Sequence, residues 1–347
     1  MTNMKAGNRK KPVKWKVYGI CGAVLAIAAV WFTWYSWNLY QQKKATEARI
    51  AASPFEAPED DGDGLIEYQG GVYERNPSVK AILCIGVDSS GTMEQKVTGD
   101  GGQADGLFLV AHDVAKDHVR ILMIPRDTMT PITLTDLSGN ILGKTEHHIT
   151  LAYGYGDGRE KSCEWTAEAV SELLSGLRID GYLAMNTSMI PVLNDMVGGV
   201  PVTVEVDGME LRDPELVKGA AVTLKGKQAD IFVRYRDIDL DNSAITRMSQ
   251  QRQYMENYFT ALKQSAAKDD QLITRLMNTI EKDMITNMPK DQYMRIGLDI
   301  INSSQALAGD DILTIPGEAV TTEMFDEFHH DPEGTLKMVL ELFYRRR

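Results

Sequence analysis

Val17 to Tyr40 is a run of 24 residues without a charged side chain, and it constrains this chain more than any other feature. As a helix the run would be about 36 Å long, enough to cross the roughly 30 Å hydrocarbon core of a bilayer. Its far end is rich in Trp and Tyr, which favour the headgroup region of a membrane. The run therefore predicts one transmembrane helix over residues 17–40.

The charges around this run set its expected orientation. Six Lys or Arg residues and no acid precede it, and the positive-inside rule keeps such a segment in the cytoplasm. We therefore expect a cytoplasmic tail over residues 1–16 and a single-pass protein of the cell membrane, with the large remainder outside. A cleaved signal peptide is the alternative, but its apolar part is shorter and ends at small residues, whereas aromatic residues end this one.

The remainder of the chain is strongly acidic, since all 49 Asp and Glu residues follow the apolar run. Such a body is unsuited to nonspecific nucleic-acid binding, which depends on neutralising phosphates, so we expect no nucleic-acid partner. A phosphate site must then be a local pocket. Cys84 and Cys163 are expected as unpaired thiols, and no His spacing indicates a zinc site.

The organisation of the outer part follows from its composition. Residues 41–77 are polar and contain an acidic run over 59–64, which predicts an extracellular linker, because the final bidentate ligand of a calcium loop is missing there. From residue 78 to 347, apolar and amphipathic segments alternate. The expected strands are 81–87, 107–112, 119–124, 181–186, 200–206 and 311–315, and the expected helices are 166–174, 188–197, a long one capped by Ser243, 271–286 and 291–303. This alternation predicts an α/β fold, a single layered α-β-α domain with a mixed central sheet.

Polar residues interrupt three of these strands at one expected edge of the sheet. Asp88 follows the first strand, Asp105 precedes the second, and Arg126 and Asp127 follow the third. A short polar link joins the second and third strands, which predicts an antiparallel hairpin that brings these ends together beside the first strand. Two carboxylates and a guanidinium suit a magnesium ion that neutralises a pyrophosphate.

A further polar signal lies at residues 233–237. In an extended segment, Arg234 and Arg236 would share one face and could bind phosphate oxygens. Each charged residue taken alone is better explained as a solvated turn or a surface ion pair. Their combination at one predicted edge is what favours a functional interpretation.

These residues fall within strings that resemble the LytR–CpsA–Psr family of membrane-anchored envelope proteins. The strings are residues 85–89, 104–106, 124–128, 152–156, 197–202 and 233–236, followed by Arg247 and Gln251, in the family's order over about residues 80–320. The resemblance implies a phosphotransferase on the outer face of a Gram-positive membrane. It would move a glycopolymer of the teichoic acid or capsule type from a polyprenyl pyrophosphate carrier to peptidoglycan through a phosphodiester bond.

The resemblance also implies a role for each matching residue. The implied assignments are Asp88 and Asp105 for Mg²⁺, Arg126, Arg234 and Arg236 for the pyrophosphate, and Arg247 and Gln251 beside the head group. Asp127 would be either an orienter of Arg126 or the general base. The lipid chain would lie in an apolar pocket between the sheet and the helices.

Three positions depart from the family pattern. Gln103 stands where the family usually has Arg, His148 where it has Lys, and Gln250 where it has the second Arg of an Arg-x-x-Arg-Gln helix. Gln103 and His148 remain candidate substrate-binding residues. The departures favour an alternative from another class, a noncatalytic scaffold or regulator of envelope assembly that binds polyprenyl-phosphate lipids. Hydrolysis of the pyrophosphate by water is a third reading.

Overall fold

The computed structural model describes residues 31–37, 40, 41, 44, 64–89, 93–116, 118–237, 243–302, 307, 309–322 and 325–347. The chain divides into two compact units, residues 1–56 and 57–347. In the first unit the described residues are helical, and most of the predicted span over residues 17–40 lies outside them. Within the described residues, no helix has both the length and the apolar character that crossing a membrane requires. The membrane topology therefore stays a prediction.

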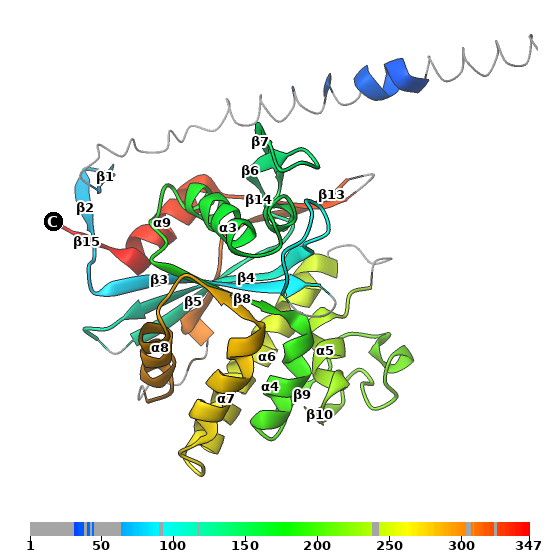
Figure 1. Ribbon diagram of the computed structural model, residues 1–347, viewed down its shortest axis with the longest axis vertical. Coiled ribbons are helices and arrows are strands. Elements are labelled where there is room, and N and C mark those ends of the chain that lie inside the picture. The colour runs from blue at the N-terminus through cyan, green and yellow to red at the C-terminus, as the bar shows by residue number, and fades with distance from the viewer. Residues whose placement is uncertain are drawn as a thin grey trace, which may run out of the picture. The chain divides into compact units, whose positions relative to one another are not determined.

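A six-stranded mixed sheet forms the centre of the second unit (Figure 1), with the order β11-β8-β3-β4-β5-β12. Its strands are β3 (Val79–Asp88), β4 (Gln103–Asp113), β5 (His118–Ile124), β8 (Gly181–Asn186), β11 (Met284–Thr286) and β12 (Ile312–Thr314). The β3–β8 and β5–β12 pairs are parallel, and the other pairs are antiparallel. The mixed sheet and the β4–β5 hairpin are both as predicted.

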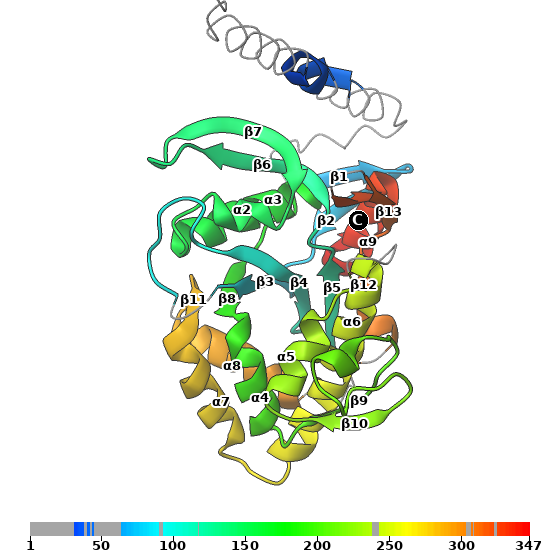
Figure 2. The same ribbon diagram turned by 90° about the vertical axis from the view of Figure 1, so that its right-hand side faces the viewer.

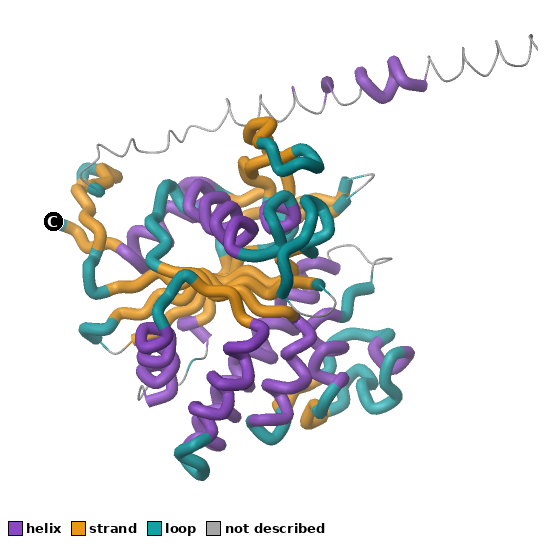
Figure 3. The backbone as a smooth tube through the Cα atoms, viewed as in Figure 1, coloured by secondary structure: helices purple, strands orange, loops and turns teal. Residues whose placement is uncertain are grey.

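Helices cover both faces of this sheet (Figure 3). On one side of the sheet lie α2 (Leu151–Gly154), α3 (Glu160–Leu173) and α9 (Pro332–Phe343), and on the other lie α4 (Ile190–Met196), α5 (Lys227–Arg234), α6 (Ser243–Ala266), α7 (Leu272–Ile280) and α8 (Lys290–Asn302). Successive strand residues alternate between the two cores, because side chains along a strand point to opposite faces. Leu83, Leu109 and Leu122 lie in one core, and Ile82, Val110 and Ile121 lie in the other.

The expected elements differ from the observed ones at several ends. The helix expected over 271–286 ends at Ile280, and β11 follows, because Met284–Thr286 pairs with β8 at the sheet edge. The strand expected over 200–206 is β9 (Val200–Thr203), which pairs with β10 (Ala221–Leu224) outside the central sheet. Short 3₁₀ turns lie at Thr187–Met189, Met209–Leu211, Glu281–Asp283 and Gly309–Asp311. Cys84 and Cys163 are free thiols, as expected.

The predicted linker over residues 41–77 is wrong for its last part. β1 (Leu65–Tyr68) and β2 (Gly71–Arg75) form a hairpin, and β2 also pairs with β15 (Tyr344–Arg346) near the carboxyl terminus. Arg75 donates to the backbone oxygen of Phe343 at 2.8 Å and pairs with Asp180 at 3.2 Å. This hairpin therefore belongs to the domain, which begins before residue 78. The acidic run over 59–63 lies outside the described residues.

Two further hairpins stand beside the central sheet. β6 (Met129–Thr135) and β7 (Ile141–His148) arch over α2 and α3, as Figure 2 shows. β13 (Gly317–Thr321) and β14 (Asp326–His330) form the other hairpin. β14 reaches the loop after β5, where Thr128 and Phe328 form a parallel bridge. This loop contains Arg126 and Asp127, so the two hairpins fix its surroundings.

Candidate active site

A β-bulge places the first two predicted carboxylates at one edge of the sheet. The β3–β4 register shifts between Gly86 and Val87, so that Gly86 faces Gly106 and Val87 faces Ala104. Asp105 is the extra residue, and a bulge of this kind re-aims the side chain that it carries. Burial is the main cause that raises the pKa of Asp105 above its ordinary value, and the negative charge of Asp88 raises it further. The two carboxylates therefore share one site.

The loop before β4 packs closely on the end of β3. Gly102 has a φ of +89°, and a Cβ atom there would lie 2.6 Å from the backbone oxygen of Asp88. Only glycine fits both constraints without a shift of the backbone. This close approach fixes the start of β4, and with it Gln103, beside Asp88.

Arg126 joins these residues as predicted. Its guanidinium forms an ion pair with Asp105 and donates to Gln103 Oε1 at 3.0 Å. Its Nε also lies 3.3 Å from Asp127 Oδ1. The rim of the sheet thus holds Asp88, Asp105, Gln103 and Arg126 together.

Asp127 faces inward and is 7% exposed. Its Oδ1 contacts Arg126, and its Oδ2 lies 3.6 Å from Nη2 of Arg247 on α6. Burial and the neighbouring Arg126 charge lower the pKa of Arg247. Of the two roles left open for Asp127, the hydrogen bond from Arg126 to Oδ1 favours the orienter, and the buried Oδ2 has no hydrogen-bond partner among the described residues.

The extended segment expected for Arg234 and Arg236 is wrong. Arg234 is the last residue of α5, because Ala229 and Phe232 recur at helical spacing and are both fully buried. Arg234 pairs with Asp88 at 2.8 Å and with Asp230 at 3.7 Å. Arg236 lies two residues beyond the helix and pairs with Asp326 on β14. Both arginines reach the site, but through different carboxylates.

The remaining predicted residues divide between the site and the core. Gln251 lies on α6 one turn after Arg247 and lines the same cavity. His148 Nε2 lies 3.1 Å from the backbone oxygen of Asp326. Gln250 points elsewhere, because its Nε2 donates to the backbone oxygen of Phe232 at 2.7 Å. The position where the family has a second Arg is therefore structural here.

A cavity of about 290 Å³ lies below the charged rim, between the sheet and the helices. Asp105, Arg234, Arg247 and Gln251 line it on the rim side. Its apolar lining includes Phe108, Met123, Met185, Leu193, Met255 and Phe259. A ligand whose anionic group binds at the rim can therefore place an attached apolar chain inside the cavity.

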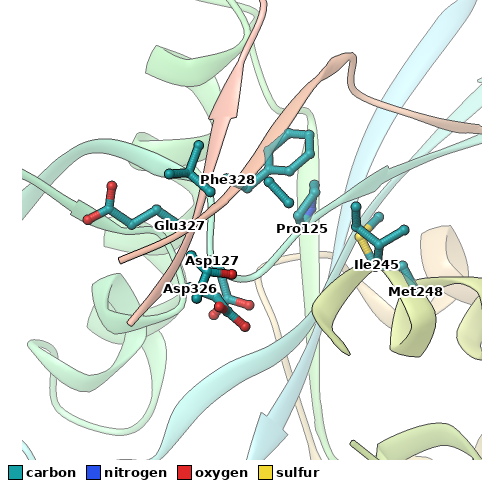
Figure 4. Close-up of a pocket in the computed structure, with 10 residues that line it drawn as sticks. Pro125, Asp127, Ile245, Met248, Asp326, Glu327 and Phe328 are labelled. Atoms are coloured by element: carbon teal, nitrogen blue, oxygen red, sulfur yellow. The ribbon is translucent and has the colours of Figure 1, made fainter. Parts of the chain in front are cut away.

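Sequence reasoning missed Asp326, which lies at the other side of this rim. Figure 4 shows its carboxylate beside that of Asp127, at a small cavity of about 10 Å³ that Pro125, Ile245, Met248 and Phe328 also line. No local pattern distinguishes Asp326 from the other acids of this chain. Only the attachment of β14 to the loop after β5 brings it here.

The described residues hold no cluster of three or more His, Cys, Asp or Glu side chains that could bind a metal ion. Asp88 and Asp105 are two close carboxylates, and their mutual repulsion contributes to the raised pKa of Asp105. Protein sites for Mg²⁺ often consist of one or two carboxylates, with substrate phosphates and water as the other ligands. The pair fits such a shared site.

The fold and the site together define a class of protein: an α/β domain with a rim of arginines and carboxylates above an apolar cavity. Such an arrangement suits a lipid with an anionic phosphate head group. The chain belongs to the LytR_cpsA_psr family, whose model matches residues 38–334.

Individual relatives agree with this assignment. The chain is 27% identical over 240 residues to the polyisoprenyl-teichoic acid–peptidoglycan teichoic acid transferase TagU of Bacillus mycoides, a match that covers 69% of each chain. The fold resembles that of protein gbs0355 from Streptococcus agalactiae, with a TM-score of 0.60 at 19% identity over 76% of this chain and 86% of that one. It also resembles TagV of B. subtilis, with a TM-score of 0.56 at 22% identity over 77% and 97%.

Proposed function

We propose that this protein transfers a glycopolymer from a polyisoprenyl pyrophosphate carrier to peptidoglycan. The observation that carries the proposal is the apolar cavity whose rim holds Asp105, Arg234 and Arg247. A lipid chain in the cavity would place its pyrophosphate among these guanidinium groups. The names of the transferase relatives support the same reaction class.

The arginines supply most of the proposed chemistry. Phosphoryl transfer rests on positioning and on charge stabilisation more than on a strong base. Arg126, Arg234 and Arg236 would bind the pyrophosphate oxygens, and Asp127 would hold Arg126 and Arg247 in place. Asp88 and Asp105 would hold Mg²⁺, which when bound neutralises phosphate charge.

The transfer step is an in-line displacement at the phosphorus attached to the glycopolymer. A hydroxyl oxygen of a muramic acid residue would form the new P–O bond, and polyprenyl phosphate would leave with the electrons of the old one. Guanidinium groups aimed at the bridging and leaving oxygens stabilise the charge that develops there. The product is a phosphodiester between glycopolymer and peptidoglycan.

We further propose that the domain works outside the cell membrane, on a single amino-terminal anchor with its tail in the cytoplasm. The support is the uncharged run over residues 17–40 and the six basic residues before it. This placement would give the domain access to both the lipid carrier and the wall.

A transfer assay tests the proposal. The full-length protein in detergent micelles is given a radiolabelled saccharide on polyprenyl pyrophosphate, Mg²⁺ and peptidoglycan. Label should enter the insoluble wall fraction, and polyprenyl phosphate should be released in equal amount. Arg126→Ala should abolish transfer. The control is Arg120→Ala, which removes the ion pair between Arg120 on β5 and Glu341 on α9 and should leave transfer unchanged. Tight lipid binding without transfer would instead support the noncatalytic scaffold.

A further inference from the structure

β14 directs one acidic side chain toward the rim and the next one away from it. Asp326 and Phe328 are two residues apart and share one face of the strand, whereas Glu327 lies on the other. Phe328 is buried in the core, and its backbone NH donates to the backbone oxygen of Asp127 at 2.8 Å. Figure 4 shows Asp326 beside Asp127, with Glu327 pointing elsewhere. The hairpin thus holds the Asp326 carboxylate at a fixed point of the site.

Two residues selected from the sequence meet at this aspartate. Arg236 pairs with its carboxylate through Asp326 Oδ2, and His148 Nε2 contacts its backbone oxygen at 3.1 Å. Asp326 Oδ1 accepts no hydrogen bond from the described residues. The carboxylate therefore presents one oxygen to Arg236 and keeps the other available.

The other carboxylates of the rim are paired with arginines other than Arg236. Asp127 Oδ1 contacts Arg126, its buried Oδ2 lies 3.6 Å from Arg247 without a hydrogen bond, and Asp105 pairs with Arg126. Asp88 pairs with Arg234. A pyrophosphate that binds Arg236 would break the ion pair between Arg236 and Asp326. A hydroxyl group of the acceptor could then donate a hydrogen bond to the Asp326 carboxylate in place of the guanidinium.

We propose that Asp326 binds and orients the acceptor hydroxyl, an inference that rests on the transferase function proposed above. The hydroxyl donates its hydrogen bond to the Asp326 carboxylate while its oxygen faces the phosphorus. As the new P–O bond forms, the proton passes to Asp326 and then to water, and the bond to polyprenyl phosphate breaks with its electrons on the leaving oxygen. Asp326 is then a catalytic residue that no local sequence pattern indicates.

The test separates this role from a structural one with two measurements on the full-length protein in micelles. Asp326→Asn should slow transfer to peptidoglycan fragments about a hundredfold. The same variant should bind methylenediphosphonate about twofold to fivefold more tightly, because the carboxylate that competes for Arg236 is gone. Asp326→Glu should restore part of the transfer rate. The matched control is Glu327→Gln, which faces the other way and should keep both properties.

Weaker diphosphate binding in Asp326→Asn would show that Asp326 only holds Arg236 in place, and it would overturn the proposal. Transfer at the wild-type rate would overturn it as well. Thermal unfolding of each variant checks the fold, and the isosteric Asn variant decides the matter if Asp326→Ala does not fold. A wild-type protein that binds methylenediphosphonate but transfers no glycan refutes the transferase function itself, and this is seen without any variant.

Discussion

Gln250 on α6 donates a hydrogen bond of 2.7 Å from its side-chain amide to the backbone oxygen of Phe232 in the last turn of α5. The same amide lies 3.4 Å from the backbone oxygen of Tyr235. Carbonyl groups at a helix end lack partners within the helix, so a buried end needs them from elsewhere. Gln250, at 4% exposure, supplies this partner and so fixes the helix that ends in Arg234.

Replacing this residue should therefore affect stability. We expect Gln250→Leu to lower the free energy of unfolding by about 1–3 kcal/mol, since a buried carbonyl loses its donor. Urea denaturation measures the change, with Gln271→Leu at an exposed position as the control. A loss of transfer without any loss of stability would mean that Gln250 acts on the substrate.

Gln103 is a departure from the family pattern that lies beside Arg126 at the rim, so an added positive charge there should increase the rate of transfer. Gln103→Arg places a second guanidinium beside Arg126, and we expect release of polyprenyl phosphate to rise roughly tenfold. Gln250→Arg should give no such gain, because its side chain points at the α5 backbone. Equal rates for Gln103→Arg and the wild type would show that the family's Arg is not needed in this chain.

Features of the site that depend on neighbouring residues in the sequence could be predicted, and features that depend on the pairing of separate strands could not. The sequence correctly predicts that Asp88, Asp105 and Arg126 lie close together, because each residue adjoins a short apolar strand and a hairpin link joins two of these strands. The bulge at Asp105 has no sequence pattern of its own, since it is a mismatch between two strands. The alternation of Arg234 and Arg236 predicts an extended segment. The segment that ends at Arg234 is instead a helix, in which Phe232 is buried against α6.

Determinants from distant segments escaped prediction for a physical reason. Asp326 reaches the rim only because β14 pairs with the loop at Thr128, about 200 residues earlier in the chain. β1 and β2 are only four and five residues long and directly follow the acidic run of the predicted linker, so only their pairing with β15 shows that they belong to the domain. The roles of the individual site residues stay predictions until they are measured.

The pH dependence of the free energy of unfolding should show the cost of burying the charged Asp105 carboxylate. Its pKa is raised in the folded state, so the charged form opposes folding at neutral pH, and this cost disappears as the pH falls through the folded pKa. Asp105→Asn should therefore unfold at higher urea concentration than the wild type at pH 7, with the difference shrinking toward pH 4. Arg126 keeps Asp127 and Gln103 as partners in this variant. A difference that grows toward acidic pH would contradict the assignment.

Filling the cavity should separate recognition of the lipid tail from recognition of the head group. Gly106 lines the cavity, and a Cβ atom built there comes no closer than 3.8 Å to a neighbour. Gly106→Leu should weaken binding of polyprenyl diphosphate about tenfold and leave methylenediphosphonate binding unchanged, because the added side chain takes up tail space. Gly106→Ala is the smaller control. Parallel losses for both ligands would place the tail elsewhere.

Topology has a direct test in intact protoplasts. Protease added outside should digest the chain after about residue 41 and spare a tag at the amino terminus, since six basic residues precede the uncharged run. Immunoblotting for the tag and for the large domain gives the result. A protected large domain would reverse the proposed orientation.

The pairing of β2 with β15 also determines when the domain can be completed. Arg345 and Glu74, joined at 2.7 Å, are 271 positions apart, so one edge of the first hairpin stays open until Tyr344–Arg346 has been synthesised. Open strand edges invite pairing with other chains. We expect a stop codon in place of Tyr344 to leave that edge permanently exposed and to raise the aggregated fraction during synthesis. Such a truncation would damage the beginning of the domain as much as its end.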